Sequence, residues 1–333
     1  MQNDFRTIVK IGKYDFAIGV DSEIMLLGSC FSDNIGACFV ESRLKATVNP
    51  FGVVYNPWSI ARLLERTMNL EWCGEDELVL HNEQWHHFDF HGVFSGTNKA
   101  DVCENINQTL ESSHQILRNT DYLILTFGTS YVYERADTSE IVANCHKMPA
   151  VFFVRYRLEP DEIVALYKEL IVSLRVFNPG LKILFTVSPV RHWKDGAHEN
   201  QLSKSVLFLA INKLVELFDG VEYFPSFEIV MDELRDYRFY DAGMFNPSGQ
   251  AVDYIWHRLV ESLLSSDAQK FISLSSKIAK ARNHRLVDFA GSEPLIFIQK
   301  SLELIENTKI QFPQADLQSD YLYFRNLLDR VEK

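Results

Sequence analysis

The residues best suited to chemistry are Ser29 and Cys30, which lie between an apolar run and the start of an amphipathic segment. The run at residues 24–27 is continuously apolar, as expected of a buried parallel strand. Ser32 or Asp33 can cap the helix that follows. The N-terminus of a helix lowers a thiol pKa and stabilises an oxyanion. We therefore predict Cys30 as the nucleophile and Ser29 as the second choice. Alternatively, Cys30 is a small buried residue that closes a tight turn.

A nucleophile of this kind needs a base, and two histidines are candidates. His192 follows an apolar run at residues 182–187, on the sheet edge where a site would lie. His86 lies in an aromatic segment at residues 85–91. We predict that His192 or His86 reaches Cys30 or Ser29. The alternative for each histidine is a hydrogen-bonded structural role.

The same aromatic segment raises the question of a metal site. In a strand, His87, Asp89 and His91 would share one face. Two imidazoles and a carboxylate are suitable ligands for zinc or iron. A hairpin with half-exposed polar positions explains the pattern equally, and nothing in the sequence supplies a second shell. We predict no metal and no cofactor.

Five blocks of the sequence occur in an order typical of one family. They are residues 28–34 (Gly-Ser-Cys-Phe-Ser-Asp-Asn), 49–57, 127–130, 188–193 and 246–248. Together they resemble the GSCFA family, a branch similar to the SGNH (GDSL-type) hydrolases, over most of residues 1–260. The resemblance puts Cys30 where those esterases carry the nucleophile.

The resemblance also implies where the donors to a tetrahedral oxyanion would be. They would be the backbone N–H groups of Cys30 and Gly52, together with a side chain just after Gly128. SGNH enzymes usually carry Asn there, whereas this chain has Ser130, whose hydroxyl can still donate one hydrogen bond. The alternative for Gly52 and Gly128 is that both serve tight turns.

The acid–base pair is where the sequence departs from its relatives. SGNH enzymes keep an Asp-x-x-His pair, and GSCFA proteins typically show Asp-Met-x-His-Pro-Ser. Here Gly243 replaces the carboxylate and Asn246 replaces the imidazole. An amide has no useful basicity at neutral pH. Asp241 is nearby in the sequence but does not have the expected spacing. We therefore predict that the acid–base pair is degenerate. We also predict that Asn246 faces the cleft.

Strand and helix signals alternate along residues 1–265. Apolar strands are predicted at 24–27, 122–126, 182–187 and 221–224, and helices at 57–68, 99–118, 160–176, 201–218 and 248–264. This alternation predicts right-handed crossovers and a parallel sheet, with the site beyond the carboxyl ends of the strands. The fold class is therefore α/β, a three-layer α/β/α sandwich of SGNH-hydrolase (flavodoxin-like) type.

Further segments depart from this alternation. Residues 78–94 and 131–156 are predicted as hairpin insertions. Residues 266–333 form a C-terminal helical extension with a break at 291–294. We predict that this extension packs on the main domain, residues 1–265, or on a partner subunit, which would make the protein a homo-oligomer.

Composition excludes several classes of protein. The 333 residues include 33 Lys and Arg against 45 Asp and Glu, a net charge of −12, which argues against a nucleic-acid partner. The five cysteines form no Cys-x-x-Cys pair, so neither a disulfide framework nor a zinc site is expected. There is no secretory pattern at the start and no apolar stretch of about 20 residues. We predict a cytoplasmic protein without a membrane partner.

Two functions fit these features. The first is a hydrolase or acyltransferase acting on a small-molecule or carbohydrate ester, where the carbohydrate is suggested by the wider superfamily alone. The second is a non-catalytic binding protein, a pseudoenzyme that keeps the SGNH cleft. Both require the strand ends before Cys30, Gly128 and Ser188 to converge on one cleft.

Overall fold

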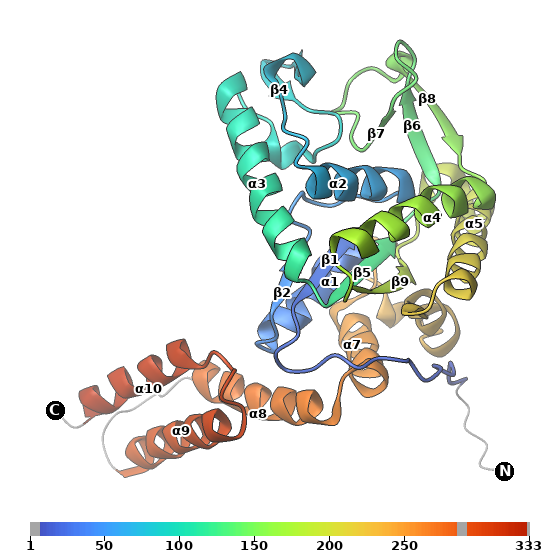
Figure 1. The fold of residues 1–333 in the computed structure, drawn as a ribbon. Helices are drawn as coiled ribbons and strands as arrows, with labels where there is room; N and C mark the ends of the chain where they lie inside the picture. The colour runs from blue at the N-terminus through green and yellow to red at the C-terminus, as the bar shows by residue number, and fades with distance from the viewer. Residues whose placement is uncertain (1–6, 285–291, 332–333) are drawn as a thin grey trace.

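The computed structural model describes residues 7–284 and 292–331, and its centre is a five-stranded parallel sheet (Figure 1). The strands are β1 (Ile24–Gly28), β2 (Ala46–Val48), β5 (Tyr122–Phe127), β9 (Lys182–Val187) and β10 (Val221–Phe224). Their order across the sheet is β2-β1-β5-β9-β10, so the winding direction reverses between β1 and β5. This is the flavodoxin-like order. The predicted α/β fold class is confirmed.

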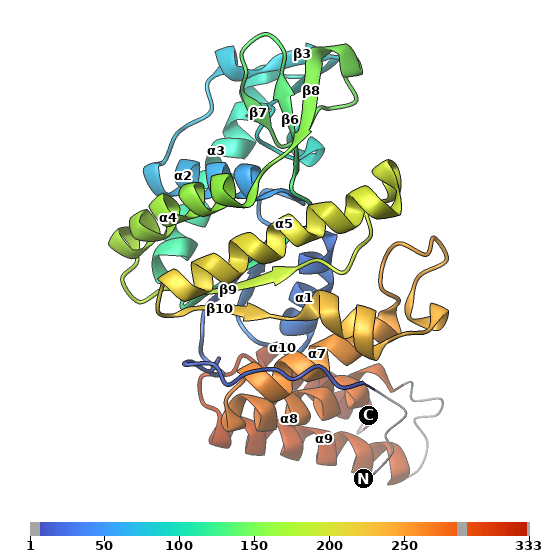
Figure 2. The same ribbon diagram turned by 90° about the vertical axis from the view of Figure 1, so that its right-hand side faces the viewer.

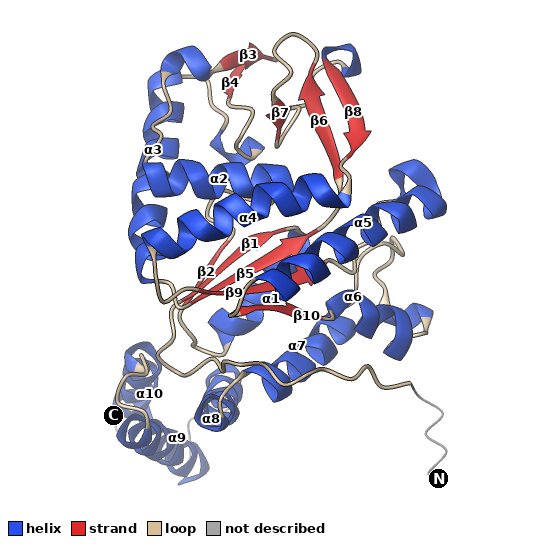
Figure 3. Cartoon of the chain, turned by 45° about the vertical axis from the view of Figure 1, so that its right-hand side comes forward, coloured by secondary structure: helices blue, strands red, loops and turns tan. Residues whose placement is uncertain are grey.

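Helices cover both faces of this sheet (Figures 2 and 3). One layer consists of α2 (Pro57–Asn69), α3 (Lys99–Asn119), α4 (Pro160–Phe177) and α5 (Gly196–Leu217); the other contains α1 (Cys30–Glu41) and α7 (Gly249–Leu263). Side chains of a strand alternate between the layers. Met25 and Leu27 enter the core beneath the first layer, whereas Ile24 and Leu26 enter the core beneath the second. The molecule is therefore a three-layer sandwich.

Two β-insertions lie beyond α2 and α4 (Figure 1). The first is a hairpin of β3 (Val79–His81) and β4 (Gln84–His86). The second is an antiparallel sheet of β6 (Tyr131–Arg135), β7 (Ile141–Val142) and β8 (Phe153–Arg157). It has three strands, where a hairpin was predicted, because β6 pairs with both neighbours.

The C-terminal helices α8 (Ser266–Asn283), α9 (Ser292–Gln311) and α10 (Gln318–Val331) form a bundle beside α7 (Figure 2). Their own core includes Ile298, Ile305 and Phe324. Asp320 joins this bundle to the main domain, since its carboxylate accepts two hydrogen bonds of 2.8 Å from Arg43. Part of the predicted break, at Gly291, lies outside the described residues.

Short elements complete the described chain. They are α6 (Ser226–Glu228), a π-helical turn at Ile229–Glu233, and 3₁₀ turns at Glu75–Glu77, Gly92–Phe94, Ala150–Phe152, Trp193–Asp195 and Tyr237–Phe239. Over the described ranges, no helix combines the length and apolar character needed to cross a lipid bilayer.

Helix α1 begins earlier than predicted. Ser29, rather than Ser32 or Asp33, is the N-cap, and its Oγ accepts a hydrogen bond from the Phe31 N–H at 3.3 Å. The Ser32 hydroxyl is instead donated to Thr126 Oγ1 on β5, at 2.7 Å. As a result, Cys30 is the first residue of the helix.

Candidate active site

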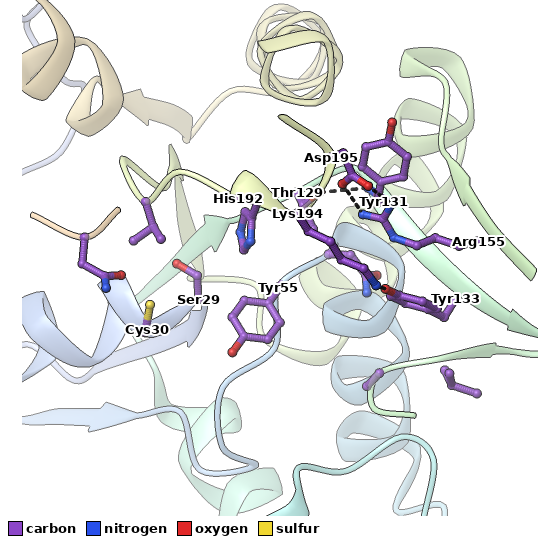
Figure 4. A pocket seen from close by; sticks show the side chains of 15 residues that line it. Ser29, Cys30, Tyr55, Thr129, Tyr131, Tyr133, Arg155, His192, Lys194 and Asp195 are labelled. Atoms are coloured by element: carbon purple, nitrogen blue, oxygen red, sulfur yellow. Dashed lines mark hydrogen bonds and ion pairs between the residues drawn. The ribbon is translucent and has the colours of Figure 1, made fainter. Parts of the chain in front are cut away.

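A cavity of about 360 Å³ lies at the carboxyl ends of the central strands (Figure 4). Ser29 and Cys30 reach it from the end of β1, Thr129 from the end of β5, and His192 from the loop after β9. Asn246, just before α7, also lines it. The loops after three neighbouring strands therefore converge on one site, at the point where the sheet reverses its winding.

Gly128 allows this convergence because it has no side chain. A Cβ atom at this position would lie 3.3 Å from His192 Nε2, 3.3 Å from Ser29 Cβ and 3.1 Å from the carbonyl oxygen of Tyr55. Such contacts are tighter than ordinary packing. Gly52 has a different role, since its φ of 76° belongs to the left-handed region that favours glycine. Gly128 thus brings His192 and Ser29 close together, whereas Gly52 forms a turn.

His192 has the properties of an available base. Its Nε2 atom has no hydrogen-bond partner among the described residues, and its ring stands edge-on to Tyr55 with centroids 5.7 Å apart. Burial, and then the charges of Lys204 and Arg155, lower the pKa of His192 to about 4. The imidazole is therefore neutral at pH 7 and can accept a proton.

The thiol of Cys30 is not activated by its helix. Burial raises the pKa of Cys30, and the charge of Asp33 raises it further. The backbone N–H groups of Cys30 and Phe31 and the charge of Lys204 act in the opposite direction, without reversing the rise. The predicted lowering of the thiol pKa is therefore wrong, because loss of hydration outweighs the helix N-terminus. The neutral thiol needs a base.

Two of the predicted oxyanion donors already have other partners. The Gly52 N–H donates to the carbonyl oxygen of Asn49 at 2.8 Å, inside a turn. The Ser130 hydroxyl donates to the carbonyl oxygen of Ser203 at 3.2 Å, and Ser130 does not line the cavity. Ser203 of α5 also accepts the Ser130 N–H at 2.9 Å, so Ser130 is bound to that helix. The Cys30 N–H remains, since the first N–H groups of a helix have no acceptor within it.

Asn246 is hydrogen-bonded to Asp241, a carboxylate that does not fit the spacing expected from the family. Its side-chain amide donates to Asp241 Oδ2 at 2.9 Å, and the Asp241 N–H donates to the carbonyl oxygen of Asn246 at 2.9 Å. The hydrogen bond from the Asn246 side chain lowers the pKa of Asp241. The structure thus pairs the Asn246 amide with the carboxylate of Asp241, two residues before Gly243.

His86 does not reach this site. Its Nδ1 is 2.6 Å from the Ser95 hydroxyl and its Nε2 is 3.1 Å from the carbonyl oxygen of His81. Both ring nitrogens are thus engaged in the first insertion, and the prediction of His86 as a base for Cys30 is wrong. His91 accepts the Val93 N–H at 3.3 Å and caps a 3₁₀ turn.

The strand face that would bring His87, Asp89 and His91 together does not form, because β4 ends at residue 86. His87 instead belongs to a group with Cys73 and Glu77 whose ligand atoms lie within 4.8 Å of one another. A buried guanidinium already contacts this group: Arg66 Nη1 is 2.9 Å from Glu77 Oε2 and 3.3 Å from His87 Nε2. A metal ion would have to displace that cation.

Lys204 is a buried cation behind the cavity that the sequence analysis missed. Its ammonium donates 2.6 Å hydrogen bonds to the carbonyl oxygens of Gly128 and Ser188, which follow β5 and β9. Burial, and then the charge of Arg191, lower its pKa to about 7. A signal was present in the sequence: Lys204 precedes Leu207 by one helical turn, so it lies on the apolar stripe of α5.

One wall of the cavity comes from the second insertion, a role that was not predicted from the sequence. Tyr131 and Tyr133 of β6 are two residues apart and so share one face, and Arg155 of β8 pairs directly with Tyr133. The guanidinium lies 4.0 Å from the centre of the Tyr131 ring. Asp195 accepts from Arg155 at 2.6 and 2.7 Å. The insertion and the loop after β9 therefore close the site together.

Similarity to known proteins is found in one family model and in solved structures. The model of the GSCFA family matches residues 23–259. No curated protein matches the chain. An acetyl xylan esterase from the rumen bacterium Butyrivibrio proteoclasticus is 14% identical with a TM-score of 0.34; the match covers 76% of this chain and 64% of that one. A carbohydrate esterase of family 3 from Talaromyces cellulolyticus is 9% identical with a TM-score of 0.36; here the coverages are 77% and 99%. The chain thus spans less than two thirds of the first of these structures.

Proposed function

The chain belongs to the GSCFA family, and we propose that it is an ester hydrolase or acyltransferase in which Cys30 is the nucleophile and His192 the base. One observation carries the proposal. Cys30, whose thiol is at a helix N-terminus, and His192, a neutral imidazole whose buried Nε2 has no partner among the described residues, line the same cavity. Nucleophilic catalysis requires this combination.

The proposed steps use groups that line the cavity. His192 Nε2 takes the thiol proton, Cys30 Sγ bonds to the acyl carbon, and the Cys30 N–H donates to the oxyanion. The carbon–oxygen bond of the ester then breaks, and the imidazolium returns its proton to the departing alcohol. Water or a second alcohol releases the acyl group. Ser29 adjoins Cys30 in the chain, and Ser29 and His192 both border Gly128 (Figure 4). The Ser29 hydroxyl can therefore relay the proton or serve as the nucleophile itself.

The proposed reaction is slow on simple esters. A base whose pKa is about 4 has little tendency to take a proton from a thiol whose own pKa is raised. The amide of Asn246 gives no help. As substrate we propose a small-molecule ester, with acylated carbohydrates as the class that the family resemblance suggests.

A second function is favoured by one observation, the pairing of Asn246 with Asp241 in place of an acid–base pair. In this alternative the protein binds an ester or its alcohol without cleaving it. The cavity would then serve recognition only.

Release of p-nitrophenol from p-nitrophenyl acetate separates the two functions. We expect slow turnover above the buffer rate that is lost in Cys30→Ala and in His192→Gln. His198→Gln is the matched control, because His198 is exposed on α5 outside the cavity lining. Turnover that survives in both Cys30→Ala and Ser29→Ala would refute the proposed nucleophiles. No turnover in the unmodified protein would favour the binding protein.

A further inference from the structure

A second cavity, of about 590 Å³, adjoins the first. Five residues line both cavities, and they mark where the two meet: Tyr55, Tyr133, Ala143, Arg155 and Lys194. The second cavity continues along the inserted sheet and is bounded there by Met148 and Phe153. We treat the two adjoining cavities as one cleft, in which Cys30 lines only the first cavity and the five shared residues mark the junction.

Positive charge is in excess along this cleft. The first cavity is lined by two cations, Arg155 and Lys194, and by one carboxylate, Asp195. The second cavity is lined by the same two cations and by no carboxylate of the described residues. The whole chain carries a net charge of −12. A cleft lined by one sign of charge concentrates ligands of the opposite sign, so a positive cleft in an acidic protein favours an anionic ligand.

Lys194 is the cation available to such a ligand. Arg155 is held by both carboxylate oxygens of Asp195, at 2.6 and 2.7 Å. Lys194 Nζ donates to the neutral hydroxyl of Tyr133 at 2.6 Å, and no carboxylate of residues 7–284 or 292–331 lies within 4.0 Å of it. An ammonium has three donors, so two remain for a ligand.

The position of Lys194 also indicates which part of an ester it would contact. In the proposed reaction the acyl carbon is at Cys30, and His192 protonates the departing alcohol. Lys194 follows His192 by two residues in the same loop. The alcohol part of the ester therefore extends toward the junction of the two cavities (Figure 4).

We propose that the alcohol part of the substrate carries a carboxylate or phosphate group, which Lys194 binds at the junction. This inference rests on the proposed function for the direction of the ester. The anion site itself needs no catalysis, so it can be tested separately.

Isothermal titration calorimetry with alcohols that contain no ester bond provides the test. The probes are glucuronate against glucose for a carboxylate, and glycerol 3-phosphate against glycerol for a phosphate. In 50 mM salt we expect at least one anionic probe to bind tenfold or more tightly than its neutral counterpart. The difference shrinks in 300 mM salt because the charges are screened.

Variants of Lys194 locate the effect. Lys194→Gln should lose about tenfold in affinity for the anionic probe and leave the neutral probe unchanged, while Lys194→Arg retains most of the affinity. Lys168→Gln is the control, because Lys168 is exposed on α4 and lines neither cavity. Equal binding of anionic and neutral probes, no binding of any probe, or an unaffected Lys194→Gln would each overturn the inference. Ester cleavage without a preference for anions refutes this inference alone, whereas anion binding without cleavage refutes the proposed function alone.

Discussion

Asn246 donates its side-chain amide to Asp241 Oδ2 at 2.9 Å, and a turn with Met244 at a φ of 61° brings the two residues together. The family resemblance puts the missing carboxylate at residue 243, whereas the carboxylate that contacts Asn246 is that of Asp241. Asn246 therefore has a carboxylate beside it but no basic group of its own. A ring at residue 246 would have a carboxylate to orient it.

Asn246→His is accordingly predicted to raise turnover of p-nitrophenyl acetate tenfold or more, since a positioned general base contributes typically about 10²–10⁴-fold. Adding Gly243→Asp should not help, because a Cβ at Gly243 would lie 3.4 Å from Asp241 Oδ1 and bring two carboxylates together. Asn246→Ala is the control. Equal rates for the His and Ala variants would show that Asp241 does not orient a base here.

The acid limb of the pH–rate profile reports on His192. Burial lowers its pKa to about 4, and the base works only when it is neutral. Activity should therefore be constant above about pH 5 and fall as the pH drops through about 4. His192→Gln should remove the activity at every pH. An acid limb near 6.5, the ordinary value for histidine, would mean that His192 is hydrated or that another group is the base.

Lys204 predicts how stability depends on pH. Its pKa is lowered to about 7 in the folded protein from 10.5, so between these values the unfolded chain binds the extra proton. The free energy of unfolding should then rise from pH 7 to 9, with a slope of at most about 1.4 kcal/mol per pH unit from this residue. Urea titrations of the unmodified protein and of Lys204→Met at both pH values measure it. The same slope in both proteins would contradict the assignment.

Gly128→Ala tests the close approach of Ser29 and His192. The added methyl would lie 3.1–3.3 Å from three neighbours, and overpacking of this kind costs roughly 1–3 kcal/mol of stability. Turnover should fall as well, since His192 must move away from Ser29. Gly92→Ala is the control, because a Cβ there meets nothing within 4 Å. If both variants unfold at the same urea concentration as the parent, Gly128 does not constrain the site.

The parts of the fold that sequence predicted best are those set by local pattern. Continuous apolar runs predicted β5 and β9 to within a residue, and the helix predicted at residues 57–68 is α2, which ends one residue later. The start of α1 was harder, because several neighbouring side chains can cap a helix. Which side chain caps α1 depends on a residue distant in sequence, since the Ser32 hydroxyl donates its hydrogen bond to Thr126 of β5 and is not used as a cap.

The loops that form the candidate site could be predicted from the sequence, but the side-chain pairs within it could not. Sequence indicated that the segments around Cys30 and His192 follow core strands, and the fold places both at one cavity. It could not reveal that Ser130 is bound by Ser203, 73 residues away, or that Arg155 meets Asp195 across the cleft. Such pairings depend on tertiary contacts, which leave no periodic pattern in the sequence.

The position of a covalent acyl group tests the central claim most directly. The unmodified protein is mixed with p-nitrophenyl acetate and digested at acidic pH, and the acetylated peptide is sequenced by mass spectrometry. We predict one acetyl group on Cys30, absent in Cys30→Ala and formed much more slowly in His192→Gln. Acetylation spread over surface lysines would contradict the assignment of this cavity as an active site. Acetylation of Cys38 or Cys145 while Cys30 stays unmodified would contradict it too.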